Sequence, residues 1–68
     1  MFKYTITLEV VLKQAGLSFT VYPVIIWPTH TKDQSVVVKA CENRYARGNK
    51  PVSVKAVRVS RELVRSVA

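Results

Sequence analysis

The first part of the chain alternates between apolar and polar side chains. Across residues 2–12 every even position is apolar and most odd positions are polar, which is the period of a strand with one buried face. Residues 13–16 follow as a short loop, and Gly16 can adopt the positive φ that tight hairpin loops use. The pattern predicts a first strand that leads into a hairpin.

A second alternation occupies residues 17–27. Its odd positions carry large apolar side chains, whereas its even positions begin polar and end apolar at Tyr22, Val24 and Ile26. Pro23 lies in the middle of this segment and has no amide hydrogen to donate to a sheet. The second strand is therefore predicted to lie at a sheet edge or to be bulged at Pro23.

A helical pattern follows the break at residues 28–30. Thr31 and Gln34 have the spacing of a capping box, which predicts a helix that begins near Lys32. Between Val37 and Tyr45 apolar residues recur at helical spacing on one face, and Gly48 is predicted to end the helix.

Residues 51–60 are predicted to form a third strand. The valines change phase along this segment, which predicts a bulge near Ala56 or a strand that is apolar on both sides. The residues after it, capped by Ser60, have the pattern of a short final helix with little stability of its own.

Together these elements predict one α+β domain of type ββαβ that spans residues 1–68. A right-handed crossover places the third strand beyond the first, which gives a three-stranded antiparallel sheet of order 2-1-3 with the helix on one face. A hydrophobic core of this size contributes only about 3–5 kcal/mol to the stability of the fold. The single cysteine allows no internal disulfide, so we expect the chain to associate as a homodimer.

The net charge of +7 is concentrated in the second part of the chain. From residue 39 onward there are eight basic residues and two acidic ones. Such a concentration attracts nucleic acids or acidic protein surfaces, although a charge of this size also serves solubility alone. The predicted basic binding surface consists of Lys39, Arg44, Arg47, Lys50, Lys55, Arg58, Arg61 and Arg65.

A second candidate surface is apolar. Four residues are predicted to lie on the sheet face away from the helix: Val11, Tyr22, Val24 and Ile26. A contiguous apolar patch on an exposed face usually marks an interface. Two explanations stay open, namely a two-fold dimer contact and a cover formed by the C-terminal segment through Leu63, Val64 and Val67.

The titratable residues do not cluster as a catalytic site requires. His30 and Cys41 are the only soft metal ligands, and two ligands do not make a closed zinc site. Cys41 shares the helical phase of Val37, which indicates a small buried hydrophobe instead of a nucleophile. The acids, which are scattered over different elements, are Glu9, Asp33, Glu42 and Glu62. We expect no enzymatic activity, no cofactor and no metal.

A lone cysteine favours a reducing, cytoplasmic compartment, because small secreted domains usually carry paired cysteines. The longest apolar run, at residues 21–28, is too short to span a bilayer and contains Pro23. The sequence has no recognisable secretion signal. A cytoplasmic protein without a membrane partner is predicted.

The order of hairpin, helix and final strand, with the stretch ACENRYARGNKPVSV at residues 40–54, resembles small phage-encoded ββαβ accessory proteins. In these proteins a helix ends in an aromatic-containing turn and leads into a valine-rich strand. The best-known group of similar architecture inhibits the host RNA polymerase in short-tailed phages. Those inhibitors tend to be acidic whereas this chain is basic. The resemblance implies a class of small proteins that modulate a larger machine, and it transfers no functional residue.

These observations favour a small, basic, non-enzymatic binding or regulatory protein. Its expected partner is an acidic host protein or nucleoprotein that meets the basic C-terminal half. The alternative is direct binding of nucleic acid through contacts to the phosphate backbone. Base stacking is a weaker form of that alternative, because the predicted surface has few exposed aromatic rings.

Overall fold

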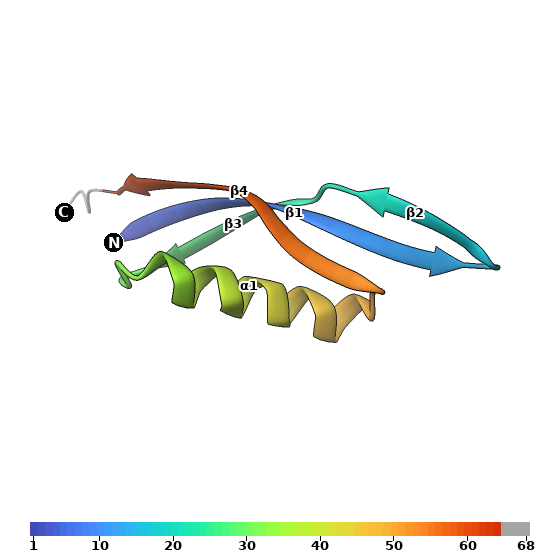
Figure 1. Cartoon of the computed structure of the whole chain (residues 1–68). Coiled ribbons are helices and arrows are strands. Elements are labelled where there is room, and N and C mark those ends of the chain that lie inside the picture. The colour runs from blue at the N-terminus through green and yellow to red at the C-terminus, as the bar shows by residue number, and fades with distance from the viewer. Residues whose placement is uncertain (65–68) are drawn as a thin grey trace.

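The computed structural model describes residues 1–64, which form one antiparallel sheet and one helix (Figure 1). The elements are β1 (Phe2–Gln14), β2 (Leu17–Val21), β3 (Val24–Thr29), α1 (Gln34–Asn49) and β4 (Ser53–Leu63). β4 pairs with residues 2–11 of β1, so β2 and β3 share the opposite edge of β1. The chain has the predicted α+β fold, in which β2 and β3 together are the second strand of the order 2-1-3.

Pro23 divides the predicted second strand without changing its register. Val21 pairs with Val10 and Val24 pairs with Thr7, so the residues on either side of the break remain in step. The Pro23 carbonyl oxygen accepts a hydrogen bond from the Leu8 amide at 3.0 Å. The predicted edge position of Pro23 is confirmed, because the missing amide hydrogen leaves no gap in the centre of the sheet.

The turn between β1 and β2 is tighter than the loop that was predicted. β1 continues to Gln14, and Ala15 and Gly16 alone connect the two strands. Both residues have positive φ, 53° at Ala15 and 81° at Gly16. Two positive φ values are characteristic of a two-residue hairpin turn that matches the twist of its strands.

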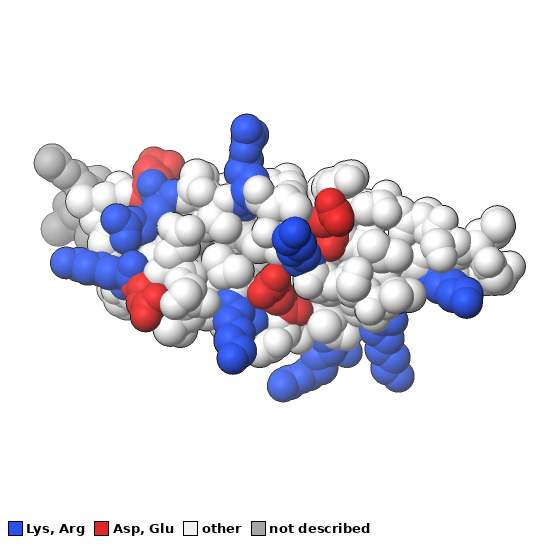
Figure 2. Space-filling model, viewed as in Figure 1, with Lys and Arg blue, Asp and Glu red and all other residues white. Residues whose placement is uncertain are grey.

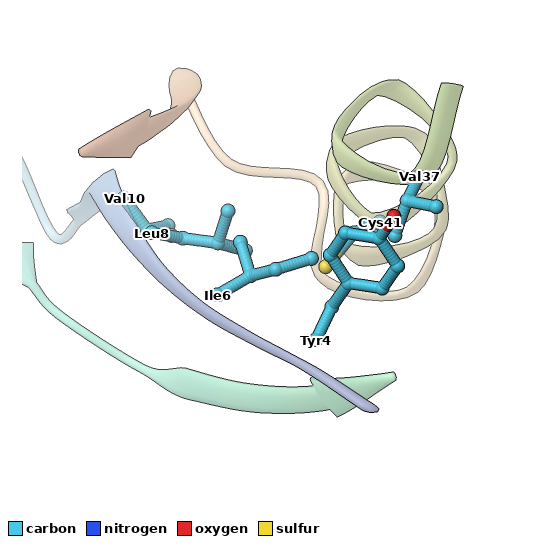
Figure 3. Close-up of a cluster of buried hydrophobic side chains, with 6 residues drawn as sticks. All are labelled: Tyr4, Ile6, Leu8, Val10, Val37 and Cys41. Carbon is cyan, nitrogen blue, oxygen red and sulfur yellow. The ribbon is translucent and has the colours of Figure 1, made fainter. Parts of the chain in front are cut away.

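The core lies between α1 and one face of the sheet (Figure 3). Four alternate residues of β1 are fully buried and point toward the helix, which contributes two more buried side chains. This core comprises Tyr4, Ile6, Leu8, Val10, Val37 and Cys41. The alternation in residues 2–12 therefore predicted the buried face of the central strand.

The helix covers only part of that face. Sixteen helical residues span about 24 Å, whereas the thirteen residues of β1 span about 44 Å. The molecule measures 51 × 19 × 16 Å, and the β1–β2 hairpin extends beyond the helix (Figure 1). Leu17 near the tip of this hairpin is 72% exposed and Phe19 is 41% exposed.

The helix begins later than the capping box predicted. Asp33 is the N-cap, and its Oδ1 accepts hydrogen bonds from the Ser35 amide at 3.1 Å and the Ser35 hydroxyl at 2.7 Å. Thr31 does not cap the helix, because its carbonyl oxygen accepts a 2.9 Å hydrogen bond from the Tyr4 hydroxyl and holds it in the preceding loop. Aspartate caps a helix at least as well as threonine, so the cap nearer to Gln34 prevails.

Gly48 does not end the helix as predicted. The helix continues to Asn49, and Lys50 takes the left-handed conformation with φ 47° while its amide donates to the Ala46 carbonyl oxygen at 2.9 Å. Pro51 follows directly, and a residue before proline is disfavoured in the right-handed helical conformation. The proline, and not the glycine, accounts for where the helix stops.

The predicted bulge in the last strand is confirmed. Arg58 pairs with Thr7 and Ala56 pairs with Leu8, so Val57 has no partner on β1. An extra residue of this kind reverses the phase of the side chains beyond it. This reversal explains why the valines of β4 change phase along the sequence.

The predicted short final helix is wrong over residues 60–63. Ser60 pairs with Thr5 and Leu63 pairs with Phe2, so the segment belongs to β4. The ladder continues past it, since the Val64 amide donates to the Met1 carbonyl oxygen at 2.9 Å. The edge of β1 provides backbone partners along its length, whereas a single helical turn is unstable alone. Residues 65–68 lie outside the described part of the chain.

Candidate binding site

The sheet face opposite α1 carries the predicted apolar surface. Alternation places Thr5 and Thr7 of β1 on this face, and their partners on both neighbouring strands lie beside them. One row across the sheet is Val24, Thr7 and Arg58, and the next is Ile26, Thr5 and Ser60. We call this surface the open sheet face and define it by these six residues with Lys55, which pairs with Glu9.

The open sheet face has an apolar rim and a cationic rim. Val24 is 58% exposed and Ile26 is 54% exposed on β3, while Lys55 and Arg58 lie on β4. Neighbouring strands are about 4.8 Å apart, so the two rims are separated by about 10 Å across the threonines of β1. A partner that contacts both rims needs apolar groups and negative charge within the width of three strands.

The other two predicted interface residues lie at the margins of this face. Tyr22 lies at the break between β2 and β3 and is 58% exposed, and Val11 is half-buried between Thr20 and Ser53. These two positions lie toward the hairpin end of the sheet. Val24 and Ile26 are therefore the centre of the exposed apolar rim.

The C-terminal cover considered for this face is not formed by residues 63 and 64. Leu63 pairs with Phe2 in the ladder and is 62% exposed, and Val64 continues that ladder through its bond to Met1. A residue that is paired edge to edge with β1 extends the sheet and does not fold over it. Val67, the third residue of the predicted cover, lies outside the described residues.

The structure does not bring the predicted basic residues into one patch. Lys55 and Arg58 lie on the open sheet face, whereas Arg61 pairs with Tyr4 on the helix side. Figure 2 shows basic side chains spread along the molecule with acidic side chains between several of them. The remaining described members lie on or directly after α1: Lys39, Arg44, Arg47 and Lys50. Arg65 lies outside the described part of the chain.

Two of the arginines make contacts within the molecule. The Arg61 guanidinium lies 5.0 Å from the centre of the Phe2 ring, and its Nη1 donates to the Lys32 carbonyl oxygen at 3.2 Å. The Arg44 guanidinium lies 5.7 Å from the centre of the Trp27 ring. Such cation–π contacts stabilise by about 0.5–1 kcal/mol at exposed positions. Sequence reasoning missed both pairs, because nothing local links residues this far apart along the chain.

A groove between β3 and α1 was also missed by sequence reasoning. It has a volume of about 390 Å³ and an apolar lining with an arginine and an asparagine on its helix side. The groove, called the β3 groove below, is lined by Ile25, Ile26, Trp27, Cys41, Arg44, Tyr45 and Asn49. α1 lies closer to β4 than to β3, which leaves this space open. The lateral position of a helix over a sheet leaves no periodic signal in the sequence.

The described residues offer little reactive chemistry. Cys41 is 2% exposed, and its burial, with a smaller effect from nearby Glu42, raises the pKa of its thiol. Within residues 1–64 there is no group of three or more His, Cys, Asp or Glu side chains that could hold a metal ion. His30 is exposed in the loop before α1. In the same part of the chain no helix has the length and apolar character needed to cross a bilayer.

Comparison with protein-family models, with curated proteins and with solved structures found no match to this chain.

Proposed function

We propose that this chain is a small non-enzymatic binding protein that attaches to a larger acidic protein or nucleoprotein and modulates it. The observation that carries the proposal is the open sheet face, where exposed Val24 and Ile26 lie across the sheet from Lys55 and Arg58. Exposed aliphatic side chains beside positive charge favour contact with a protein surface that is both apolar and acidic.

The distribution of charge favours a protein partner over nucleic acid alone. A duplex touches one side of a small protein at a time, and the basic residues here are divided between the open sheet face and α1. Phosphate binding gains from many cations on one side, because each neutralised phosphate releases counterions. An acidic protein needs fewer cations, since apolar burial supplies part of the binding energy.

A role as a modulator fits the absence of clustered acids and nucleophiles in the sequence and the resemblance to small phage accessory proteins. The described acids lie on different elements, with Glu9 on β1, Glu42 on α1 and Glu62 on β4. The support for a phage origin and for a host machine as the partner comes from that resemblance.

The test is capture from a bacterial lysate with the immobilised 68-residue chain, at low salt, with and without nuclease. We expect an acidic protein to be retained in both cases. Val24→Thr combined with Ile26→Thr should abolish retention, because threonine keeps the β-branch that suits a strand but removes apolar surface. Val36→Thr is the matched control, since Val36 is 55% exposed on the helix.

Two results would count against the proposed function. Retention that disappears with nuclease would assign binding to nucleic acid. Retention of no acidic protein by the unmodified chain at low salt would remove the proposal altogether.

A further inference from the structure

β3 has one open edge within residues 1–64. It pairs with β1 on one side only, and the Pro23 carbonyl oxygen accepts from the Leu8 amide. Backbone groups alternate in direction along an edge strand. The odd residues of β3 therefore direct their backbone groups toward β1, and Val24 and Ile26 direct theirs outward.

The opposite edge of the sheet is obstructed at Ala56 and Val57. The Ala56 amide on β4 already donates to Glu42 of α1 at 3.0 Å, and Val57 interrupts the ladder as a bulge. A bulge and a capped amide both hinder the pairing of another strand. On the β3 edge the comparable obstacle is Pro28, which lies near the end of the strand.

Side chains on both sides of the β3 edge are suited to an added strand. Ile25 and Trp27 line the β3 groove on the helix side of the sheet, while Val24 and Ile26 are exposed on the open sheet face, and Ile26 also borders the groove. Side chains of a strand alternate between the two faces of its sheet. A strand paired with β3 would place one set of its side chains in the groove and the other set over Val24 and Ile26.

The charge of the groove indicates what such a strand carries. Arg44 and Asn49 supply its polar groups, and none of its lining residues in the described part of the chain is acidic. The 68-residue chain has a net charge of +7. A carboxylate on the added strand would meet Arg44 with favourable electrostatics, whereas a lysine or arginine would be repelled.

We propose that the β3 edge binds an extended acidic segment of a partner protein by strand addition. One apolar side chain of that segment enters the β3 groove beside Trp27 and Tyr45, and an Asp or Glu two positions along the segment, on the same face, meets Arg44. The proposal rests on the proposed function and specifies where the partner binds. A second copy of this chain is the poorer occupant, because it carries the same net charge of +7 and the two copies repel each other.

The probe is a fluorescein-labelled synthetic peptide of about ten residues, the upper end of common strand lengths. One set of alternate positions carries valine and threonine, and the other carries glutamates around one central phenylalanine. Fluorescence anisotropy with the 68-residue chain should show saturable binding. The same peptide with lysine in place of glutamate should bind at least about tenfold more weakly, which corresponds to about 1.4 kcal/mol.

Two pairs of variants locate the site. Ile26→Pro removes a backbone amide that points away from β1 and should abolish binding. Thr20→Pro removes an equivalent amide on the same edge of the sheet, at β2 and away from the groove, and should leave binding unchanged. Arg44→Glu should weaken binding at least about tenfold, and Arg47→Glu, an equal charge change outside the groove, less than about threefold. Circular dichroism of each variant checks that it remains folded.

Three outcomes would overturn the proposal. The first is no change in anisotropy with the acidic peptide at millimolar protein. The second is an equal loss of peptide affinity for Arg44→Glu and Arg47→Glu. The third is a dimer in sedimentation that Ile26→Pro dissociates. The last result would assign the edge to a second copy. If the unmodified chain and Arg44→Glu capture the same acidic protein from lysate, the proposed function stands and this site is wrong. If neither captures any, the proposed function fails, and the peptide result still decides whether the edge binds strands.

Discussion

Glu42 on α1 accepts a hydrogen bond from the backbone amide of Ala56 on β4, with 3.0 Å between Oε2 and N. Ala56 lies next to Val57, the residue without a partner at the bulge. The carboxylate therefore satisfies an amide at the outer edge of the sheet. The bond also joins the helix to the β4 side of the molecule, which agrees with the space that remains beside β3.

Removing this bond should destabilise the fold. Glu42→Ala should lower the free energy of unfolding by about 1–2 kcal/mol, because a hydrogen bond to a charged group is lost and the amide remains part-buried. Glu42→Gln should lower the free energy of unfolding by less, since the amide side chain retains an acceptor oxygen. Urea denaturation of the three proteins measures the difference.

Glu62→Ala is the matched control for that series. Glu62 is 69% exposed and lies 3.5 Å from the Lys3 ammonium, and exposed ion pairs contribute only about 0–1 kcal/mol. A loss for Glu62→Ala as large as that for Glu42→Ala would mean that removal of negative charge, and not the bond to Ala56, accounts for the effect.

The helix cap should make stability depend on pH at acidic values. The hydrogen bond from the Ser35 hydroxyl is the main cause that holds the pKa of Asp33 below its ordinary value, with smaller contributions from the Val36 and Ser35 amides and an opposing effect of burial. A lowered folded-state pKa contributes stability above the unfolded-state pKa of about 3.9. This contribution is lost as the pH falls through the lower folded-state value.

Ser35→Ala tests the cause of that shift. The variant removes the hydroxyl that lies 2.7 Å from Asp33 Oδ1, so the pKa of the Asp33 carboxyl should rise toward its ordinary value in an NMR titration. Asp33→Asn should flatten the decline of melting temperature with acid, because asparagine still caps a helix but does not titrate. An unchanged Asp33 pKa in Ser35→Ala would contradict the assignment.

The two glycines should respond in opposite ways to the same substitution. Gly16 has φ 81°, whereas Gly48 lies within α1, and an added Cβ would meet no atom within 4 Å at either position. Gly16→Ala should lower the free energy of unfolding by about 1 kcal/mol, because the left-handed conformation is unfavourable for alanine. Gly48→Ala should raise it by about 0.5–1 kcal/mol through helix propensity. Thermal unfolding of both variants measures the signs, and equal signs would contradict the backbone explanation.

The parts of the fold that could be predicted are those with a local, repeating cause. The alternation of residues 2–12 identified the buried face of β1, and the missing amide of Pro23 placed the second strand at an edge. The change of valine phase in β4 indicated the bulge that leaves Val57 without a partner. Each of these features follows from the geometry of one strand.

The features that were missed depend on contacts between distant segments. Ser60 and the residues after it were assigned to a helix because nothing local shows that β1 offers them a partner. The β3 groove exists because α1 lies toward β4, and the bond from Ala56 to Glu42 spans two elements. Predicting such a groove requires the relative placement of a helix and a sheet, which side-chain periodicity does not determine.

The division of basic residues between two sides limits the salt dependence of any nucleic-acid binding. Within residues 1–64, the side of the sheet away from α1 carries four cations: Lys3, Lys13, Lys55 and Arg58. Lys3 and Lys13 alternate with the buried residues of β1, and Lys55 and Arg58 pair with Glu9 and Thr7, which also alternate with them.

Each phosphate neutralised on duplex DNA contributes a slope of about −0.9 to log K against log salt, so contact by these four residues predicts a slope of about −3.6. Contact by all eight members of the predicted basic surface would instead give about −7. A titration of duplex binding between low and physiological salt distinguishes the two. Lys55→Ala with Arg58→Ala should flatten the slope by about 1.8 if the open side binds, while Lys39→Ala, on the helix, should leave it unchanged. A slope near −7 would mean that nucleic acid contacts both sides of the molecule, and it would favour nucleic acid over an acidic protein as the partner.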